Sequence, residues 1–112
     1  MPKEKIGVLC SGRGSNLASI IDAVERGDIR AEIAVVLADK ADAYALTRAL
    51  EHGIPAVAVV RKVYAAREDF ERALLEQLHA HGVTLVALAG FMRILSPLFV
   101  RAYAGRILNI HP

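Results

Sequence analysis

Five short apolar runs recur along the chain, each separated from the next by a longer stretch of mixed polarity. The runs are Ile6 to Cys10, Ile33 to Leu37, Ala56 to Val60, Leu85 to Ala89 and Ile107 to Ile110. Their apolar residues are nearly continuous and do not alternate with polar ones, which is typical of strands buried on both faces. The pattern therefore predicts five buried β-strands.

The stretches between these runs carry helical periodicity, with apolar residues three and four positions apart. The stripes are Leu17, Ile20, Ile21 and Val24, closed by Gly27; Leu46, Ala49 and Leu50, closed by Gly53; and Phe70, Ala73, Leu74 and Leu78, closed by Gly82. A fourth, short helix is predicted from Ser96 and Pro97 to Tyr103, before Gly105. Serine can cap free helix amides, and proline fits the first helical turn.

The alternation of strands and helices predicts an α/β fold, an open, mostly parallel, doubly wound sheet with helices on both faces. Strands joined through helices pair in parallel with right-handed crossovers. At 112 residues the chain is long enough for one core and too short for two, so it forms one domain or part of one. Because such sheets bind ligands beyond the carboxyl ends of their strands, the candidate residues are sought there.

Composition and charge exclude several classes of protein. The chain is 54% hydrophobic and 23% charged, as expected of a globular protein. Its 14 Lys and Arg residues are interleaved with 12 acidic ones, so no nucleic-acid partner is expected. No stretch approaches the roughly 20 apolar residues of a membrane helix, and no signal peptide is evident, so we expect no membrane partner and a cytoplasmic location. The single cysteine, Cys10, offers neither an internal disulfide nor a zinc-ligand spacing, and no metal is expected.

A glycine-rich turn, residues 11–17, follows the first predicted strand and leads into the first helix. The first amides of a helix lack internal acceptors and carry partial positive charge, which suits a phosphate. Gly12 and Gly14 allow the backbone to approach the anion closely, while Ser15 and Asn16 can add side-chain donors or cap the helix. The turn therefore predicts a phosphate-binding loop.

Two other interpretations of this turn remain open. It can be a plain helix cap with two turn glycines. It can also be a dinucleotide fingerprint, with Asp39 as the acidic residue that binds a ribose. Leu17 stands where that fingerprint has its third glycine, so a mononucleotide phosphate suits the loop better.

The last predicted strand ends with two polar side chains on one face. Strand side chains alternate, so Leu108 and Ile110 share one face while Asn109 and His111 share the other. An unpaired amide in a buried strand costs about 1–3 kcal/mol, so Asn109 is expected to have a partner. An asparagine amide and a titratable histidine suit acyl transfer to an amine; a structural Asn beside a surface His is the alternative.

The predicted loop after the fourth strand, residues 90–95, is unusually apolar for a connection. One interpretation packs Phe91 and Leu95 into the core and leaves Arg93 in water. The other makes the loop a wall for a flat apolar ligand, with Arg93 as its polar contact. The residues alone favour neither.

Taken together, three segments resemble the folate-dependent phosphoribosylglycinamide formyltransferase family. They are Ser11-Gly12-Arg13-Gly14-Ser15-Asn16-Leu17, Leu88-Ala89-Gly90-Phe91-Met92-Arg93-Ile94-Leu95-Ser96-Pro97 and Asn109-Ile110-His111-Pro112. The segment from Asp39 to Ala43 is similar as well. The resemblance runs along essentially the whole chain.

The resemblance implies roles for individual residues. Gly14, Ser15 and Asn16 would hold the phosphate of glycinamide ribonucleotide. The folate-binding residues would be Arg67, Met92, Arg93, Ile94, Leu95 and Asn109.

The resemblance also implies the reaction. The amine of glycinamide ribonucleotide would attack the formyl carbon of 10-formyltetrahydrofolate, with no metal and no covalent enzyme intermediate. Asn109 would hydrogen-bond the formyl oxygen, and His111 would be the general acid that shuttles protons. A non-catalytic nucleotide-binding fragment is an alternative, as is a related formyl-folate enzyme with another acceptor.

The family continues well beyond Pro112, where its third catalytic residue, an aspartate, is found. We therefore expect residues 1–112 to be the N-terminal, phosphate-binding part of a single formyltransferase domain, truncated at its C-terminal side. Such a chain is expected to be nearly inactive alone. With an exposed sheet edge, it would pair with the complementary C-terminal half or with another copy of itself.

Overall fold

The computed structural model describes residues 3–110 and contains one five-stranded parallel sheet with the strand order β3-β2-β1-β4-β5. The strands are β1 (Glu4–Cys10), β2 (Ala31–Ala38), β3 (Ala56–Ala58), β4 (Leu85–Ala89) and β5 (Ile107–Ile110). The helices are α1 (Ser15–Glu25), α2 (Tyr44–Glu51), α3 (Arg67–Ala80) and α4 (Pro97–Ala102), with a 3₁₀ turn, η1 (Arg61–Val63). The predicted α/β fold is confirmed.

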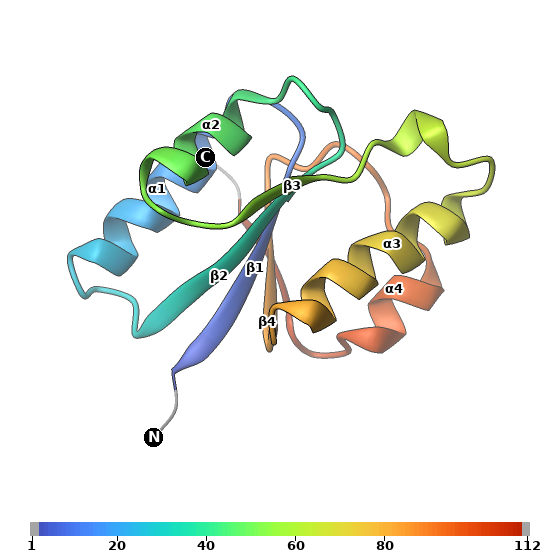
Figure 1. The fold of residues 1–112 in the computed structure, drawn as a ribbon. Helices are drawn as coiled ribbons and strands as arrows, with labels where there is room; N and C mark the ends of the chain where they lie inside the picture. Colours follow the sequence, from blue (N-terminus) through green and yellow to red (C-terminus); the bar gives the residue numbers. More distant parts are fainter. Residues whose placement is uncertain (1–2, 111–112) are drawn as a thin grey trace.

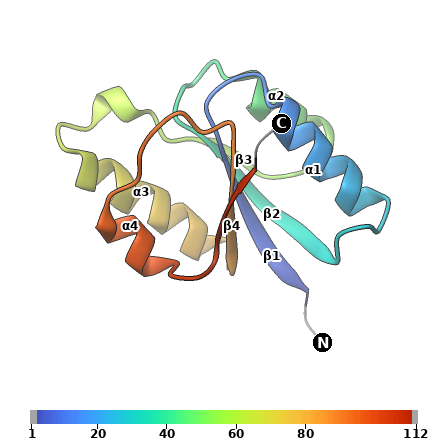
Figure 2. The same ribbon diagram turned by 180° about the vertical axis from the view of Figure 1, so that it is seen from behind.

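The helices cover the sheet from both sides, as Figures 1 and 2 show: α1 and α2 lie on one side, α3 and α4 on the other. Each side has its own apolar core. Leu17 and Ile21 of α1 pack with Val8 of β1, whereas Phe70 of α3 and Phe99 of α4 pack in the second core. The sheet is therefore the middle of three layers.

Strand β1 is the centre of the sheet, and the chain winds outward from it in two directions. It runs first through β2 to the edge strand β3, and then crosses back to β4 and outward to β5. Because right-handed crossovers in opposite directions place helices on opposite faces, the connections after β1 and β4 diverge. The carboxyl ends of β1 and β4 thus flank the crevice where such folds bind ligands.

Burial on both faces, predicted for all five strands, holds for the central strands and is wrong for the two edges. Ile6 to Cys10 of β1 are all buried. In β3 no residue is fully buried, and in β5 Leu108 is 50% exposed and Asn109 is exposed as well. An edge strand pairs on one side only, so less of its surface is covered.

Helix α2 differs from the predicted apolar stripe. Leu50, expected on the buried face, is 64% exposed. The helix buries Ala49, as predicted, together with Ala45, which lay outside the predicted stripe. These two residues are four positions apart, so they lie on one face. Their small side chains allow α2 to lie close to its neighbours.

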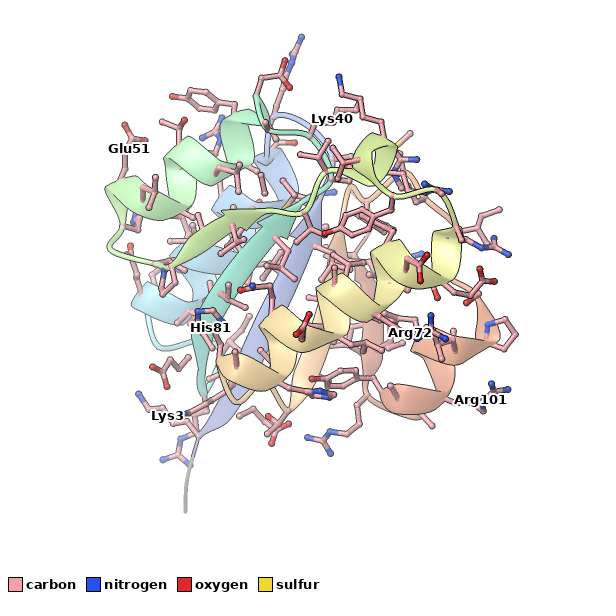
Figure 3. All side chains as sticks on the ribbon, turned by 45° about the vertical axis from the view of Figure 1, so that its right-hand side comes forward. Lys3, Lys40, Glu51, Arg72, His81 and Arg101 are labelled. Atoms are coloured by element: carbon pink, nitrogen blue, oxygen red, sulfur yellow. The ribbon has the colours of Figure 1, made fainter. Side chains whose placement is uncertain are left out.

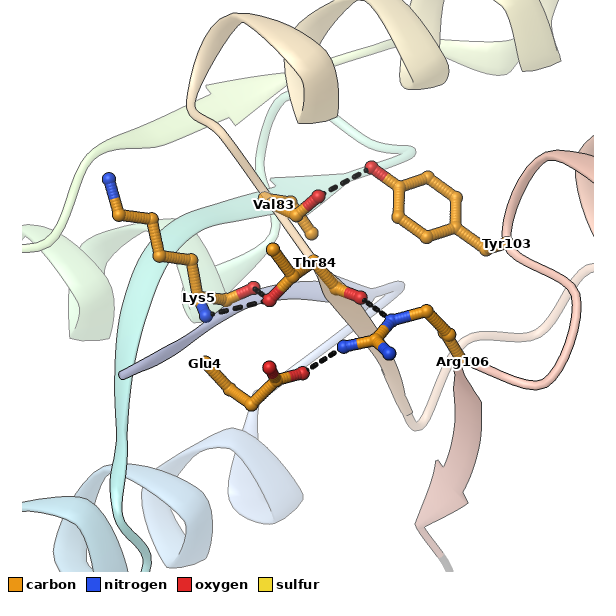
Figure 4. Close-up of polar contacts among 6 residues, drawn as sticks. All are labelled: Glu4, Lys5, Val83, Thr84, Tyr103 and Arg106. Carbon is orange, nitrogen blue, oxygen red and sulfur yellow. Dashed lines mark hydrogen bonds and ion pairs between the residues drawn. The ribbon is translucent and has the colours of Figure 1, made fainter. Parts of the chain in front are cut away.

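Polar contacts tie the amino ends of the strands together, as Figure 4 shows. The backbone N–H of Lys5 donates to Thr84 Oγ1 at 3.0 Å, and Tyr103 donates its hydroxyl to the Val83 carbonyl at 3.0 Å. Arg106 donates to the Thr84 carbonyl and to Glu4. This end of the sheet is closed by its own hydrogen bonds, whereas the candidate site lies at the opposite end.

No membrane-spanning helix is expected from the sequence. Between residues 3 and 110, no helix combines the length and the apolar character that crossing a bilayer requires.

Cys10, at the end of β1, is a free, fully buried thiol. Burial, with a smaller contribution from the nearby negative charge of Asp39, raises the pKa of Cys10 from 9.0 to about 12. The unfolded thiol ionises first, so this residue lowers the free energy of unfolding as the pH rises from 9 towards 12 and has no such effect below pH 9.

We expect Cys10 in the native chain to react with an aromatic disulfide reagent at pH 8 roughly a thousandfold more slowly than in the denatured chain, because thiolate is the reactive form. Absorbance of the released thiol measures both rates. Equal rates would contradict the burial of this side chain.

Candidate substrate site

A cleft of about 200 Å³ lies at the carboxyl ends of β1 and β4. Its lining residues come from the glycine-rich turn, the segment after β2 and the segment after β4. They are Ser11, Gly12, Arg13, Gly14, Ser15, Asn16, Lys40, Ala89, Gly90 and Met92. The predicted phosphate loop therefore forms one wall of the crevice that the topology creates.

The phosphate loop leads directly into α1. Gly14 is the N-cap residue, with φ 79° and ψ 28°, and its carbonyl accepts a hydrogen bond from the Ala18 N–H at 2.8 Å. The amides of Ser15 and Asn16 belong to the first helical turn, where no internal acceptor exists. Neither side chain caps the helix. These amides, with the helix dipole behind them, suit a phosphate group.

The structure adds a packing reason for glycine at position 14 to the predicted one. A Cβ placed there would lie 2.8 Å from the Cα of Ala45 in α2, whereas a Cβ on Gly12 would have no neighbour within 4 Å. The approach of α2, together with the left-handed backbone, thus excludes a side chain at Gly14.

The apolar loop after β4 is held at three points. The Met92 N–H donates to the hydroxyl of buried Ser11 at 2.9 Å. Arg93 forms an ion pair with Asp39, whose side chain is 1% exposed. Ser96, at the end of the loop, is bound by Glu71. The loop is therefore fixed to the residues that directly follow β1 and β2, and to α3.

Glu71 is the most deeply buried charged residue described, at 0% exposure. Its Oε2 accepts the Ser96 N–H at 2.7 Å, and its Oε1 accepts the Ser96 hydroxyl. Ser96 occupies the N-cap of α4 as predicted, but its side chain makes no capping bond. The capping role predicted for the Ser96 hydroxyl is wrong, because the hydroxyl donates its hydrogen bond to Glu71.

The two interpretations of the apolar loop each hold in part. Phe91 and Leu95 pack against the core on the α3 side, as the first interpretation has it. Arg93 is not free in water, because it pairs with Asp39. The second oxygen of Asp39, Oδ1, is buried without a hydrogen-bond partner. That acid is committed to Arg93, which weakens its alternative role as a ribose ligand.

Four predicted folate residues meet at a second pocket of about 330 Å³. It is lined by Arg61, Arg67, Phe70, Glu71, Met92, Arg93 and Ile94. Met92 and Ile94 are 81% and 83% exposed, which is unusual for large apolar side chains. Leu95 is half-buried in the core and does not line this pocket. Three arginines and two exposed apolar side chains suit a flat ligand with a charged tail.

Asn109 lies on β5, opposite Leu88 of β4. It is exposed, so the expected burial of its amide is wrong, and the amide is open to solvent. Ile110 packs with the core on the α1 side, as the predicted alternation requires. His111 lies outside the described residues, and its role stays a prediction.

Several residues of the site carried no clear signal in the sequence. Glu71 lies three and seven positions before the buried Leu74 and Leu78, a spacing that places it beside the helix stripe, but an acidic residue there is usually solvated. Lys40 and Arg48 reach the phosphate loop only through the fold. Only the tertiary structure shows that these two residues lie at the loop.

No group of three or more His, Cys, Asp or Glu side chains able to hold a metal ion occurs within residues 3–110. The site offers hydrogen-bond donors, cations and apolar side chains. Such a site can bind an anionic ligand beside a flat one.

Fold and site together define an α/β protein with clefts at the carboxyl edge of a parallel sheet, where folds of this kind bind ligands. The chain belongs to the formyl transferase family, whose sequence pattern matches residues 4–112.

Similar proteins include single-function formyltransferases and a trifunctional purine biosynthetic protein. The chain is 48% identical over 109 residues to the phosphoribosylglycinamide formyltransferase of Haemophilus influenzae, covering 97% of the chain and 51% of that protein. It is 46% identical over 114 residues to the trifunctional purine biosynthetic protein adenosine-3 of Chironomus tentans, covering 8% of that protein. The crystal structure of glycinamide ribonucleotide transformylase 1 from Symbiobacterium toebii matches with a TM-score of 0.94 and 46% identity, over 98% of the chain and 52% of that structure. The chain thus spans about half the length of these single-function relatives.

Replacing Gly14 by Ala is expected to lower the free energy of unfolding by about 1–2 kcal/mol for the left-handed backbone alone, with a further loss from the clash with α2. Gly12→Ala is the matched control and should change it by less than about 0.5 kcal/mol. Urea unfolding measures both. Equal effects would show that α2 does not exclude a side chain at Gly14.

Glu71→Ala is expected to cost at least about 2 kcal/mol of stability, because it leaves two donors of Ser96 without an acceptor. Glu71→Gln keeps one acceptor oxygen and should lose less than half as much. Urea denaturation of the two variants and the parent gives the comparison. A Glu71→Ala variant as stable as the parent would mean that the carboxylate does not hold the loop.

Proposed function

We propose that this chain supplies the phosphate-binding half of an enzyme that transfers a formyl group from 10-formyltetrahydrofolate to the amine of glycinamide ribonucleotide. Family membership and the names of the relatives support the reaction. The proposal includes the cytoplasmic location expected from the sequence.

One observation carries the proposal: Met92 lines both the phosphate cleft and the second pocket. A ligand held by its phosphate at Gly14, Ser15 and Asn16 would therefore extend next to a flat ligand lying against Met92 and Ile94. Placing two reactants side by side is the main requirement of a transfer between them.

The second pocket fits the donor by its chemistry. The pterin and benzoate rings of a folate are flat and would lie against exposed apolar side chains. Its glutamate tail is anionic and would suit Arg67 and Arg93 at the pocket. Arg93 would then exchange part of its pairing with Asp39 for a carboxylate of the ligand.

The transfer itself would use the polar pair at the end of β5. The substrate amine attacks the formyl carbon, the carbonyl oxygen gains negative charge, and the bond to the folate nitrogen breaks after a proton reaches that nitrogen. The Asn109 amide would donate to the charged oxygen, and His111 would supply and accept protons. Asn109 is exposed at the carboxyl half of β5, where a ligand can reach it.

The single-function relatives are about twice as long as this chain, so we also propose that a complementary C-terminal half completes the site. That half would cover the β5 edge and add to the folate pocket. The small-molecule substrates and this complementary half are the partners of the proposal.

The experiment measures formation of formylglycinamide ribonucleotide from the two substrates, with the chain alone and with the C-terminal half of the Haemophilus influenzae relative. Activity is expected only in the mixture. His111→Ala should lower kcat at least about 100-fold, because it removes the general acid. His79→Ala, an exposed histidine on α3, is the matched control and should leave kcat unchanged.

Two results would contradict the proposal. Full activity of the chain alone would show that no complementary half is needed. A mixture that assembles, binds both ligands and yet transfers no formyl group would leave a binding module without chemistry.

A further inference from the structure

Helix α2 supports the phosphate loop from behind. The Ala45 N–H at the start of α2 donates to the Gly12 carbonyl at 3.1 Å. One turn later, the Nε of Arg48 donates to the Arg13 carbonyl at 2.8 Å. Two consecutive carbonyls of the loop are therefore held by one helix.

Arg48 is fixed in this position by its own packing. Its guanidinium carbon lies 4.9 Å from the centre of the Tyr44 ring, within range of a cation–π contact. Its Cδ lies so close to Gly14 that a Cβ there would be 3.2 Å away. Among the described residues, those that line the phosphate cleft include Arg13 and Lys40 but not Arg48. Arg48 thus contacts the loop and not the cleft.

The carbonyl contacts determine where the loop amides point. The peptide bonds among residues 3–110 are all trans, so each carbonyl and the N–H that follows it point in opposite directions. Holding the Arg13 carbonyl against Arg48 directs the Gly14 N–H away from α2. Holding the Gly14 carbonyl against Ala18 directs the Ser15 N–H away from the body of α1. Successive amides are thus aimed out of the loop before any ligand binds.

We propose that Arg48 is a positioning residue for phosphate recognition: its hydrogen bond to the Arg13 carbonyl orients the Gly14 amide towards the bound phosphate. The inference rests on the proposed function for the identity of the ligand. It differs from a direct role, because the Arg48 cation acts through the loop and does not touch the phosphate. Arg48 therefore favours phosphate binding as a hydrogen-bond donor, and its positive charge contributes less.

Three variants separate donor from charge. Arg48→Met keeps the apolar stem and removes the donor. Arg48→Gln keeps an N–H donor and removes the charge. Arg72→Leu is the control, because Arg72 is an exposed residue of α3 that carries the same charge. It lies across the sheet from α2 and well apart from Lys40 in Figure 3.

The probes are glycinamide ribonucleotide and inorganic phosphate, titrated into the ¹⁵N-labelled chain and followed by the amide signals of Gly14, Ser15 and Asn16. We expect Arg48→Met to weaken both ligands roughly tenfold and to lose the Gly14 shift. Arg48→Gln and Arg72→Leu should bind within about threefold of the parent chain. Should Arg48→Met fail to fold, Arg48→Gln decides alone: near-parent binding supports the inference, and a tenfold loss overturns it.

The remaining outcomes separate this inference from the proposed function. Equal binding by Arg48→Met and the parent overturns the inference and leaves the proposed function standing. Binding of inorganic phosphate but not of glycinamide ribonucleotide overturns the proposed substrate. The role of Arg48 is then still tested by comparing phosphate binding of Arg48→Met and the parent chain. If the parent chain binds neither ligand, both fail.

Discussion

The burial of β1 on both faces and along both edges is the constraint on which the rest of the structure depends. Val8, Leu9 and Cys10 are fully buried, and the strand pairs with β2 on one side and β4 on the other. A strand in that position must be covered by helices from both sides, so the chain reverses its winding direction there. That reversal opens the crevice in which the phosphate loop and the apolar loop meet. The location of the site is thus a consequence of how the core is buried.

Polar groups buried in the core serve this same site. Within residues 3–110 the buried polar side chains are Ser11, Asp39, Glu71 and Ser96, and each is bonded to, or belongs to, the segment from Met92 to Ser96. Burying a polar group is costly unless it is paired, so a protein has few such groups. Here they hold one loop in one position. The loop can then expose Met92 and Ile94 to a ligand without collapsing onto the core.

Much of the fold and part of the site could be predicted from local pattern. The glycine-rich turn was singled out because it joins a strand to a helix, and the apolar loop because its composition is odd for a connection. The contacts that support these loops could not be found this way. Glu71, Asp39 and Arg48 are separated from the residues they hold by 25, 54 and 35 positions. No local rule pairs residues at such distances.

The sequence by itself determined the order of strands and helices, the parallel sheet and the two loops that line the site, because each depends on hydrophobic periodicity or on turn chemistry over a few residues. Tertiary structure alone decided three other matters. These are which strands become exposed edges, why Gly14 must lack a side chain, and which buried side chains hold the loops. Each of the three arises where segments distant in the chain come into contact, as where the backbone of α2 approaches Gly14. Such contacts depend on the packing of whole elements, which periodicity does not encode.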